Sequence, residues 1–456
     1  MTAELAVSGQ TERMPFPIIL LVAAIAAGAV AQGGFYPAGR FLVAILTGLA
    51  LAAALVPRTD RWDSRDTWPA ATACAALAVW AGVRAVVAGT PTAGLPTIMT
   101  LACMVAAMAV LRRADQAQRE LCALSAIGIG VFVAASGWIG VVWRIQPLAL
   151  PGDERLWRAA STLTYANAAA AVLAPLALLT IALLTARPAA YTRRVAAFVL
   201  LLGLGATFSR GGLLGFAVGL VALAALAGVR STARIVAAPL LGAIVATAAL
   251  APSVPDTERP RTTLALAGAA VGLVIAVGVP RLPGRWPLAA FSAGALGIAG
   301  AVSAIANTAG MDRLVGDRGS LTSPTRLESA RAALRLFTEH PIAGVGPGRS
   351  TFPWMVDGHL VTGRYAHDEY LQVLTELGAV GLALLILVLA ALVYTIYRGR
   401  PATRPAPLWA GAAAAFAAII VHSGFDFLWQ LPVIPLAGVM LAGLAGPGRS
   451  TAKEAE

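Results

Sequence analysis

Charged residues are scarce in this sequence. Only 12% of the 456 residues are Asp, Glu, Lys or Arg, whereas ordinary soluble domains contain roughly 25%. Hydrophobic residues make up 58% of the chain, and the mean hydropathy is +0.77. Because so little polar surface cannot cover a globule in water, the composition excludes a soluble protein and indicates a membrane protein.

Cysteine is also rare. The three cysteines, Cys74, Cys103 and Cys122, lie inside or at the edge of apolar segments and form no CxxC pair. This pattern excludes a disulfide framework and a zinc site, and it predicts small buried thiols. The net charge is +12 and comes almost entirely from arginine. In a membrane protein the placement of arginine sets the orientation, so we expect no nucleic-acid partner.

Long apolar segments repeat along the chain. They are about 16 to 25 residues long, which suits helices that cross a hydrocarbon core of about 30 Å. They are rich in Ala, Leu, Val and Gly, without the alternation of barrel strands. We therefore expect an all-α, polytopic bundle of about 12 to 14 membrane spans. The expected spans lie near 16–30, 41–56, 69–88, 95–111, 121–143, 163–184, 195–207, 213–229, 235–251, 264–279, 288–308, 371–397, 408–427 and 431–444.

Arginine placement predicts the topology. If the N-terminus is cytoplasmic, the short inner connections carry most of the arginines, among them Arg112, Arg113 and Arg119, as the positive-inside rule requires. We therefore expect a bacterial inner-membrane protein with both termini in the cytoplasm. The expected parts are an N-terminal membrane bundle at 1–308, a periplasmic loop with short helices at 309–366, C-terminal membrane helices at 367–446 and a cytoplasmic tail at 447–456.

The long outer loop carries seven arginines on the translocated side. Two explanations stand: long loops translocate largely regardless of charge, or the loop forms an anion site. Ser323-Pro324 is typical of a helix start, and His340-Pro341 of its end. The apolar residues between them recur at helical spacing and predict a short amphipathic helix that lies on the membrane surface or on the bundle; they are Leu327, Ala330, Leu334 and Phe337.

A glycine-rich segment, Gly344-Val345-Gly346-Pro347-Gly348, follows that helix. Such a turn can aim backbone N–H groups at phosphate, or it can be a simple tight turn. Two cations lie near the outer ends of spans: Arg84, which can snorkel to the interface, and Arg210, which stands beside two glycines. His367 precedes a late span, where an imidazole can accept a proton from a hydroxyl near neutral pH, or cap the helix.

The order of these motifs resembles the O-antigen ligase and polymerase superfamily. The resemblance covers roughly residues 164–432 and rests on four segments: Ser209-Arg210-Gly211-Gly212, the outer loop with Arg326 and His340 to Gly348, His367-Asp368-Glu369-Tyr370-Leu371, and Glu376-Leu377-Gly378. It implies a GT-C-like, metal-independent, inverting glycosyltransferase without a cofactor. Such enzymes move a glycan from undecaprenyl diphosphate to a hydroxyl of a lipid-linked or surface acceptor at the periplasmic face.

The resemblance also implies site residues. His367, Arg210 and Arg326 match the family's catalytic histidine and arginines, whereas Asn167 matches only loosely and the segment with Asp426 only partially. We expect Arg210 and Arg326 to hold the diphosphate while His367 deprotonates the acceptor, because guanidinium groups stabilise the charge of a departing diphosphate. The residues expected to bind substrate are Arg84, Asn167, Arg364 and Asp426.

Two alternatives stay open at this point. Asp368, Glu369 and Glu376 could bind a divalent cation, although carboxylates at a helix start also favour the helix dipole. A multi-span transporter or flippase for an anionic lipid or solute would also suit so many spans. Against a transporter, the two halves show no repeat and the polar residues gather outside the membrane rather than at its midplane. Under the transferase hypothesis, the sequence does not distinguish a ligase from a polymerase.

Overall fold

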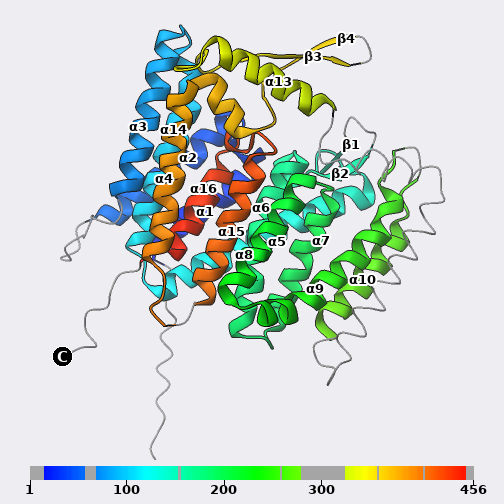
Figure 1. Cartoon of the computed structure of the whole chain (residues 1–456). Coiled ribbons are helices and arrows are strands. Elements are labelled where there is room, and N and C mark those ends of the chain that lie inside the picture. The colour runs from blue at the N-terminus through cyan, green and yellow to red at the C-terminus, as the bar shows by residue number, and fades with distance from the viewer. Residues whose placement is uncertain are drawn as a thin grey trace, which may run out of the picture.

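The computed structural model describes residues 15–56, 68–151, 156–256, 259–278, 324–356, 359–403 and 406–447. Within them the chain is 79% helical and contains 14 α-helices, most of which run side by side in one bundle (Figure 1). The helices are α1 (Phe16–Val30), α2 (Pro37–Leu55), α3 (Trp68–Val87), α4 (Leu95–Arg112), α5 (Gln116–Trp143), α6 (Ala166–Ala186), α7 (Tyr191–Ala206), α8 (Arg210–Ala227), α9 (Val229–Leu250), α10 (Thr262–Gly278), α13 (Pro324–Glu339), α14 (Glu369–Arg398), α15 (Pro407–Ser423) and α16 (Val433–Ala445).

The apolar segments form membrane-spanning helices, as expected. Eight helices of the described part are long and apolar enough to cross a membrane, namely α2 to α6, α8, α9 and α14, and four shorter apolar helices accompany them, namely α1, α10, α15 and α16. This confirms an all-α, polytopic membrane bundle. The expected span at 288–308 and the expected tail from residue 448 lie outside the described residues.

One end of the bundle carries the non-membrane elements. The helix α13 and two antiparallel strand pairs lie there (Figure 1), β1 (Ala149–Pro151) with β2 (Trp157–Ala159) and β3 (Phe352–Val356) with β4 (His359–Gly363). We call this end the site end. Strands β3 and β4 lie in the expected loop beside helix α13, whereas β1 and β2 lie between α5 and α6. Outside the hydrocarbon core, backbone groups can also bond to water, so short open strand pairs are tolerated there.

Helix α13 forms where the sequence predicts it. Leu327 and Leu334 of its apolar face are 45% and 47% exposed, so they do not pack into the bundle and are left for the membrane surface. Ser329 and Ala333 are buried instead, and Ala333 packs against Phe352 of β3. Small side chains let the helix approach its neighbours closely, so close packing rather than hydrophobicity selects the buried face.

Helix α14 is interlocked with the segment that follows α13. The helix is broken at Gly378, where φ is 69° and ψ is −169°. The indole N–H of Trp80 donates to the carbonyl of Leu377, the residue before the break, at 2.9 Å. Pro341 accepts a hydrogen bond from the backbone N–H of Ala379 at 2.9 Å. A Cβ at position 378 would lie 2.2 Å from the carbonyl oxygen of Ile342, so only glycine fits.

The glycine-rich turn uses its backbone N–H groups in the same junction. Val345 donates to the carbonyl of Thr375 and Gly346 to that of Glu376, both at 2.9 Å. These donors are therefore engaged by α14 and do not point at a ligand. Of the two interpretations of this segment, the structure supports the structural turn rather than a phosphate cradle.

Helices α8 and α15 pack closely along a row of glycines. Gly211, Gly215 and Gly219 are spaced one turn apart on α8, and an added Cβ at each would collide with α15. At Gly211 the collision is with His422, and at Gly215 it is with the backbone of Ala418. Small residues at such spacing let two membrane helices approach closely. This packing brings the start of α8 against the end of α15 at the site end.

Candidate functional site

The buried carboxylate of Asp426 is the centre of the candidate site. It follows the end of α15 and is 0% exposed. Its Oδ1 lies 3.2 Å from Nδ1 of His367, and its Oδ2 lies 3.6 Å from Nη2 of Arg326. Oδ2 also accepts a hydrogen bond from the Tyr165 hydroxyl at 2.6 Å and one from the Asn167 amide. One carboxylate thus joins four side chains from three separate parts of the chain.

These contacts keep Asp426 ionised. Burial alone would raise the pKa of the carboxyl, but the hydrogen bond from His367 and the charge of Arg326 outweigh it and lower the pKa to about 2. A buried charge is tolerated only when it is paired and hydrogen-bonded, and both conditions hold here. Asp426 was expected to bind substrate; its complete burial favours a role in holding the side chains around it.

His367 is held in an unusual backbone conformation. Its φ is +54°, the left-handed region that costs non-glycine residues about 1–2 kcal/mol. The ring is 30% exposed and packs edge-on against Phe427, with centroids 5.1 Å apart. The next residue, Asp368, caps α14 by accepting from the N–H groups of Tyr370 and Leu371. An ionised carboxylate can only accept, so Nδ1 is the donor in the contact with Asp426 and Nε2 is the ring nitrogen left for another partner.

Two arginines reach the same region from helix starts. Arg326, the third residue of α13, donates through Nη1 to the carbonyl of Phe425 at 2.8 Å. Arg210 is the first residue of α8, whose start is capped by the hydroxyl of Ser209. The adjacent Gly211 packs against Phe425, because an added Cβ there would lie 3.0 Å from the Phe425 side chain. Arg326 thus contacts the segment that carries Asp426, and Arg210 precedes a residue that packs against the same segment.

Asn167 stands at the start of α6 and links Asp426 to a further cation. Its side-chain oxygen accepts from Nη2 of Arg158 at 2.8 Å, and Nε of Arg158 donates to the carbonyl of Thr207 at 2.9 Å. Arg158 and Tyr165 were not among the site residues predicted from the sequence. Burial and the charge of Asp426 raise the pKa of Tyr165, so its hydroxyl stays protonated and donates. The only sequence signal was the proximity of Tyr165 to Asn167.

Aromatic rings form a stack beside His367. Phe427 lies between Tyr165 and Tyr365, with ring centroids 5.3 and 4.5 Å away. The guanidinium of Arg364 lies 5.9 Å from the ring centre of Tyr365, and Arg364 itself is exposed. Arg364 is thus placed at the open edge of the site, where it stays a candidate for substrate binding.

Arg84 is engaged elsewhere. Its Nε donates to the carbonyl of Ala343 at 2.8 Å, and its Nη2 donates to that of Gly344 at 2.9 Å. Arg84 therefore ties α3 to the glycine-rich turn. It was expected to bind substrate, and its geometry favours an anchoring role, because two of its donors are already engaged by backbone carbonyls.

The acidic residues around the start of α14 are each held by protein donors. Glu369 accepts from the backbone N–H of Trp429 at 3.0 Å, and Glu376 accepts from the hydroxyl of Ser350 at 2.7 Å. Together with the capping role of Asp368, this gives each carboxylate a structural function. Among the described residues, no group of three or more His, Cys, Asp or Glu side chains converges as a metal site would require.

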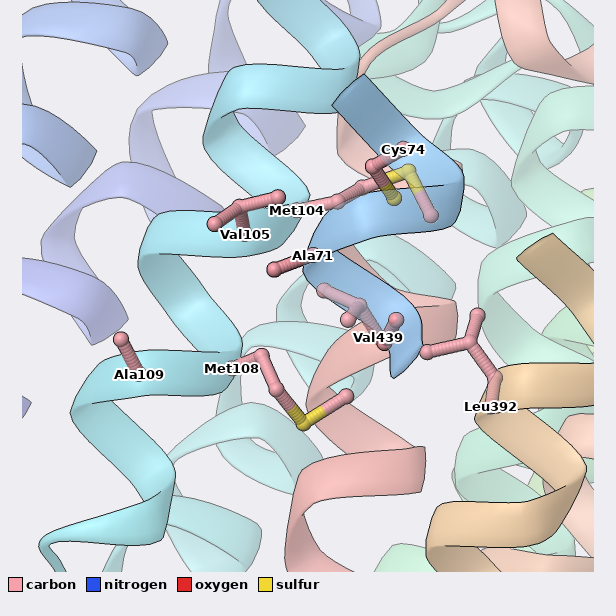
Figure 2. Close-up of a pocket in the computed structure, with 9 residues that line it drawn as sticks. Ala71, Cys74, Met104, Val105, Met108, Ala109, Leu392 and Val439 are labelled. Carbon is pink, nitrogen blue, oxygen red and sulfur yellow. The ribbon is translucent and has the colours of Figure 1, made fainter. Parts of the chain in front are cut away.

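An apolar cavity opens within the membrane part of the bundle. It is lined by residues of α3, α4, α14 and α16, among them Cys74, Met104, Met108, Leu392 and Val439 (Figure 2). None of its lining residues is charged. A cavity of this kind suits hydrocarbon, whereas the groups able to handle an anion lie at the site end.

The fold and the site define a multi-pass membrane protein that gathers arginine and histidine at one end of its helix bundle. A family model described as O-antigen ligase matches residues 259–386 of the chain. The match includes Arg326 and His367 and supports the assignment to the O-antigen ligase and polymerase superfamily. It supports a membrane glycan-processing function of the ligase and polymerase type. The comparison with curated proteins gave no match.

Proposed function

We propose that the protein is a metal-independent, inverting glycosyltransferase that moves a glycan from undecaprenyl diphosphate to a hydroxyl acceptor. The observation that carries the proposal is the buried Asp426 carboxylate, which holds His367 and Arg326 side by side at the site end. In this proposal the protein lies in the bacterial inner membrane, both termini are cytoplasmic and the site end faces the periplasm. The family match supports the reaction class.

His367 acts as the general base. Its Nε2 accepts the proton of the acceptor hydroxyl while that oxygen attacks the anomeric carbon of the donor sugar. A carbon–oxygen bond to the acceptor forms, the bond between the sugar and the diphosphate breaks, and undecaprenyl diphosphate departs with the electron pair. Asp426 keeps the imidazole oriented and stabilises the imidazolium that forms, as the carboxylate does in other histidine–aspartate pairs.

Arg210 and Arg326 stabilise the departing diphosphate. Guanidinium groups bind phosphate oxygens in a bidentate fashion, and fixed donors at a partly dry site stabilise developing charge more strongly than water does. The contact of Arg326 with Phe425 and Asp426 holds its side chain before the donor arrives. Arg364, exposed beside Tyr365, extends the cationic edge toward the substrate.

The test is transfer by purified protein in lipid nanodiscs. A defined undecaprenyl-diphosphate glycan is incubated with lipid A-core, with a second copy of the donor, or with neither. We expect His367→Ala and Arg326→Ala to abolish product formation. The matched controls are His340→Ala and Arg335→Ala, which change exposed residues of the same loop and should keep full activity. Full transfer by His367→Ala protein at normal levels would refute the proposal.

The same assay separates the two acceptor classes and tests the metal question. Growth on lipid A-core indicates a ligase, and growth on the donor indicates a polymerase. We expect excess chelator to leave the rate unchanged, since Asp368, Glu369 and Glu376 are held by separate protein donors. Loss of activity in chelator, restored by a divalent cation, would overturn the metal-independent mechanism.

A further inference from the structure

A second histidine lies beneath the candidate site. His422, on the last turn of α15, is 2% exposed. Among the described residues, neither of its ring nitrogens has a hydrogen-bond partner. Buried polar groups are nearly always satisfied, and an apolar side chain would fill the same space at lower cost. We therefore expect the imidazole of His422 to gain a hydrogen-bond partner when a ligand is bound.

The position of His422 indicates what that partner is. The edge of the ring that carries Nε2 and Cδ2 lies against the first turn of α8: a Cβ at Gly211 would be 3.1 and 2.8 Å from these atoms. Two charged groups interact electrostatically with the ring: Asp426 in the loop after α15, and Arg326 on α13. The imidazole thus sits between a helix start and the ion pair of the site.

The start of α8 is itself suited to an anion. Helix starts leave backbone N–H groups without a partner in the helix and carry a partial positive charge, so they bind phosphate readily. The hydroxyl of Ser209 accepts from the third N–H of the helix, that of Gly212, at 3.2 Å. Arg210 adds a full positive charge at the same position. A neutral imidazole can add a hydrogen bond without adding charge.

We propose that the first turn of α8 and His422 form the subsite for the diphosphate, with the N–H of His422 donating to one of its oxygens. The proposal rests on the proposed function and deepens it. His422 is then a binding residue for the leaving group, distinct from His367, which handles the acceptor. Glycine at position 211 is required because any side chain there would fill the space between the imidazole and the helix start.

The test measures binding of inorganic pyrophosphate separately from transfer. Thermal stabilisation by pyrophosphate and its inhibition of transfer are compared in wild-type, His422→Asn and His422→Leu proteins in nanodiscs. We expect His422→Leu to weaken the binding of pyrophosphate by about tenfold or more, which is the loss typical of one hydrogen bond to a charged group. His422→Asn, which keeps an N–H donor, should stay within about threefold of wild type. The KM for the acceptor should not change.

Two glycine variants serve as matched controls. Gly211→Ala places a methyl group against the imidazole and should weaken the binding of pyrophosphate. Gly219→Ala lies two turns away and places its methyl group against Ala414 and Leu178. It should lower only the melting temperature. Unchanged pyrophosphate affinity in His422→Leu, or equal losses in the Asn and Leu variants, would overturn the proposal. Transfer activity in the His367→Ala protein would instead refute the proposed function. The two failures are distinguishable because thermal stabilisation by pyrophosphate is measured without transfer.

Discussion

The replacement Asp426→Asn tests the arrangement of the site most directly. Asparagine keeps the shape of the side chain, but it removes the charge that pairs with Arg326 and orients His367. A hydrogen bond to a charged group contributes about 1.5–3 kcal/mol, so losing two such contacts removes about 3–6 kcal/mol. Since about 1.4 kcal/mol corresponds to a factor of ten in rate, we expect kcat to fall at least about a hundredfold.

The assay is the initial rate of transfer of a labelled glycan at saturating donor. The matched control is Asp115→Asn, which removes another hydrogen-bonding carboxylate, the cap of α5 at the opposite end of the bundle. That variant should lose little stability, because asparagine caps a helix about as well as aspartate does, and it should lose no activity. If Asp426→Asn protein kept more than a tenth of the wild-type kcat, Asp426 could not be orienting the general base.

The same carboxylate makes stability depend on pH. Its folded-state pKa is about 2, below the ordinary value of 3.8, so its contribution of about 2 kcal/mol is complete above pH 4 and is lost as the pH falls toward 2. The melting temperature of the wild-type protein should therefore fall more steeply between pH 4 and pH 2 than that of Asp426→Asn. Parallel curves for the two proteins would contradict the low pKa.

The remaining predictions concern the contacts around the site. Gly378→Ala should lower the melting temperature by several degrees, because the methyl group would collide with the carbonyl of Ile342; a calorimetric melt that matches wild type would disprove the interlock. Tyr165→Phe removes one donor to Asp426 and should lower kcat about threefold to tenfold, with an unchanged KM for the donor. Ser209→Ala should cost about 1 kcal/mol at the start of α8 and raise the KM for the donor, measured from donor titrations.

Hydropathy allowed the membrane helices to be predicted from the sequence almost one by one. A run of apolar residues of sufficient length must span as a helix, because its backbone groups can find partners only within the segment. Helix α1 covers 16–30, the predicted range. Hydropathy could not predict which residues of α13 pack against its neighbours, because Ser329 and Ala333 are buried through close approach and not through hydrophobicity.

The site could be predicted only in part, for a different physical reason. His367 and Arg326 stand in recognisable local motifs, whereas the residues that hold them are distant in the chain. Tyr165 and Asp426 are 261 positions apart, and their hydrogen bond is a property of how α6 and α15 pack. The same applies to Arg158, which reaches Asn167 and Thr207 only through the turn before α6. No pattern in the sequence encodes such pairs. Asn167 and Asp426 were therefore expected only from the family resemblance, and their hydrogen bonds with Arg158 and Tyr165 were not predicted.

The direction of the helices gives the site its preference for anions. Four helices begin around it: Asn167 is the second residue of α6, Arg210 the first of α8 and Arg326 the third of α13, while His367 immediately precedes the cap of α14. Helix starts carry positive partial charge, so the backbone and the arginines act on a ligand with the same sign. In the proposed reaction, this field would stabilise the diphosphate as its bond to the sugar breaks and would disfavour a divalent cation at the same place. The helix starts and the arginines would then supply the charge stabilisation without a metal ion.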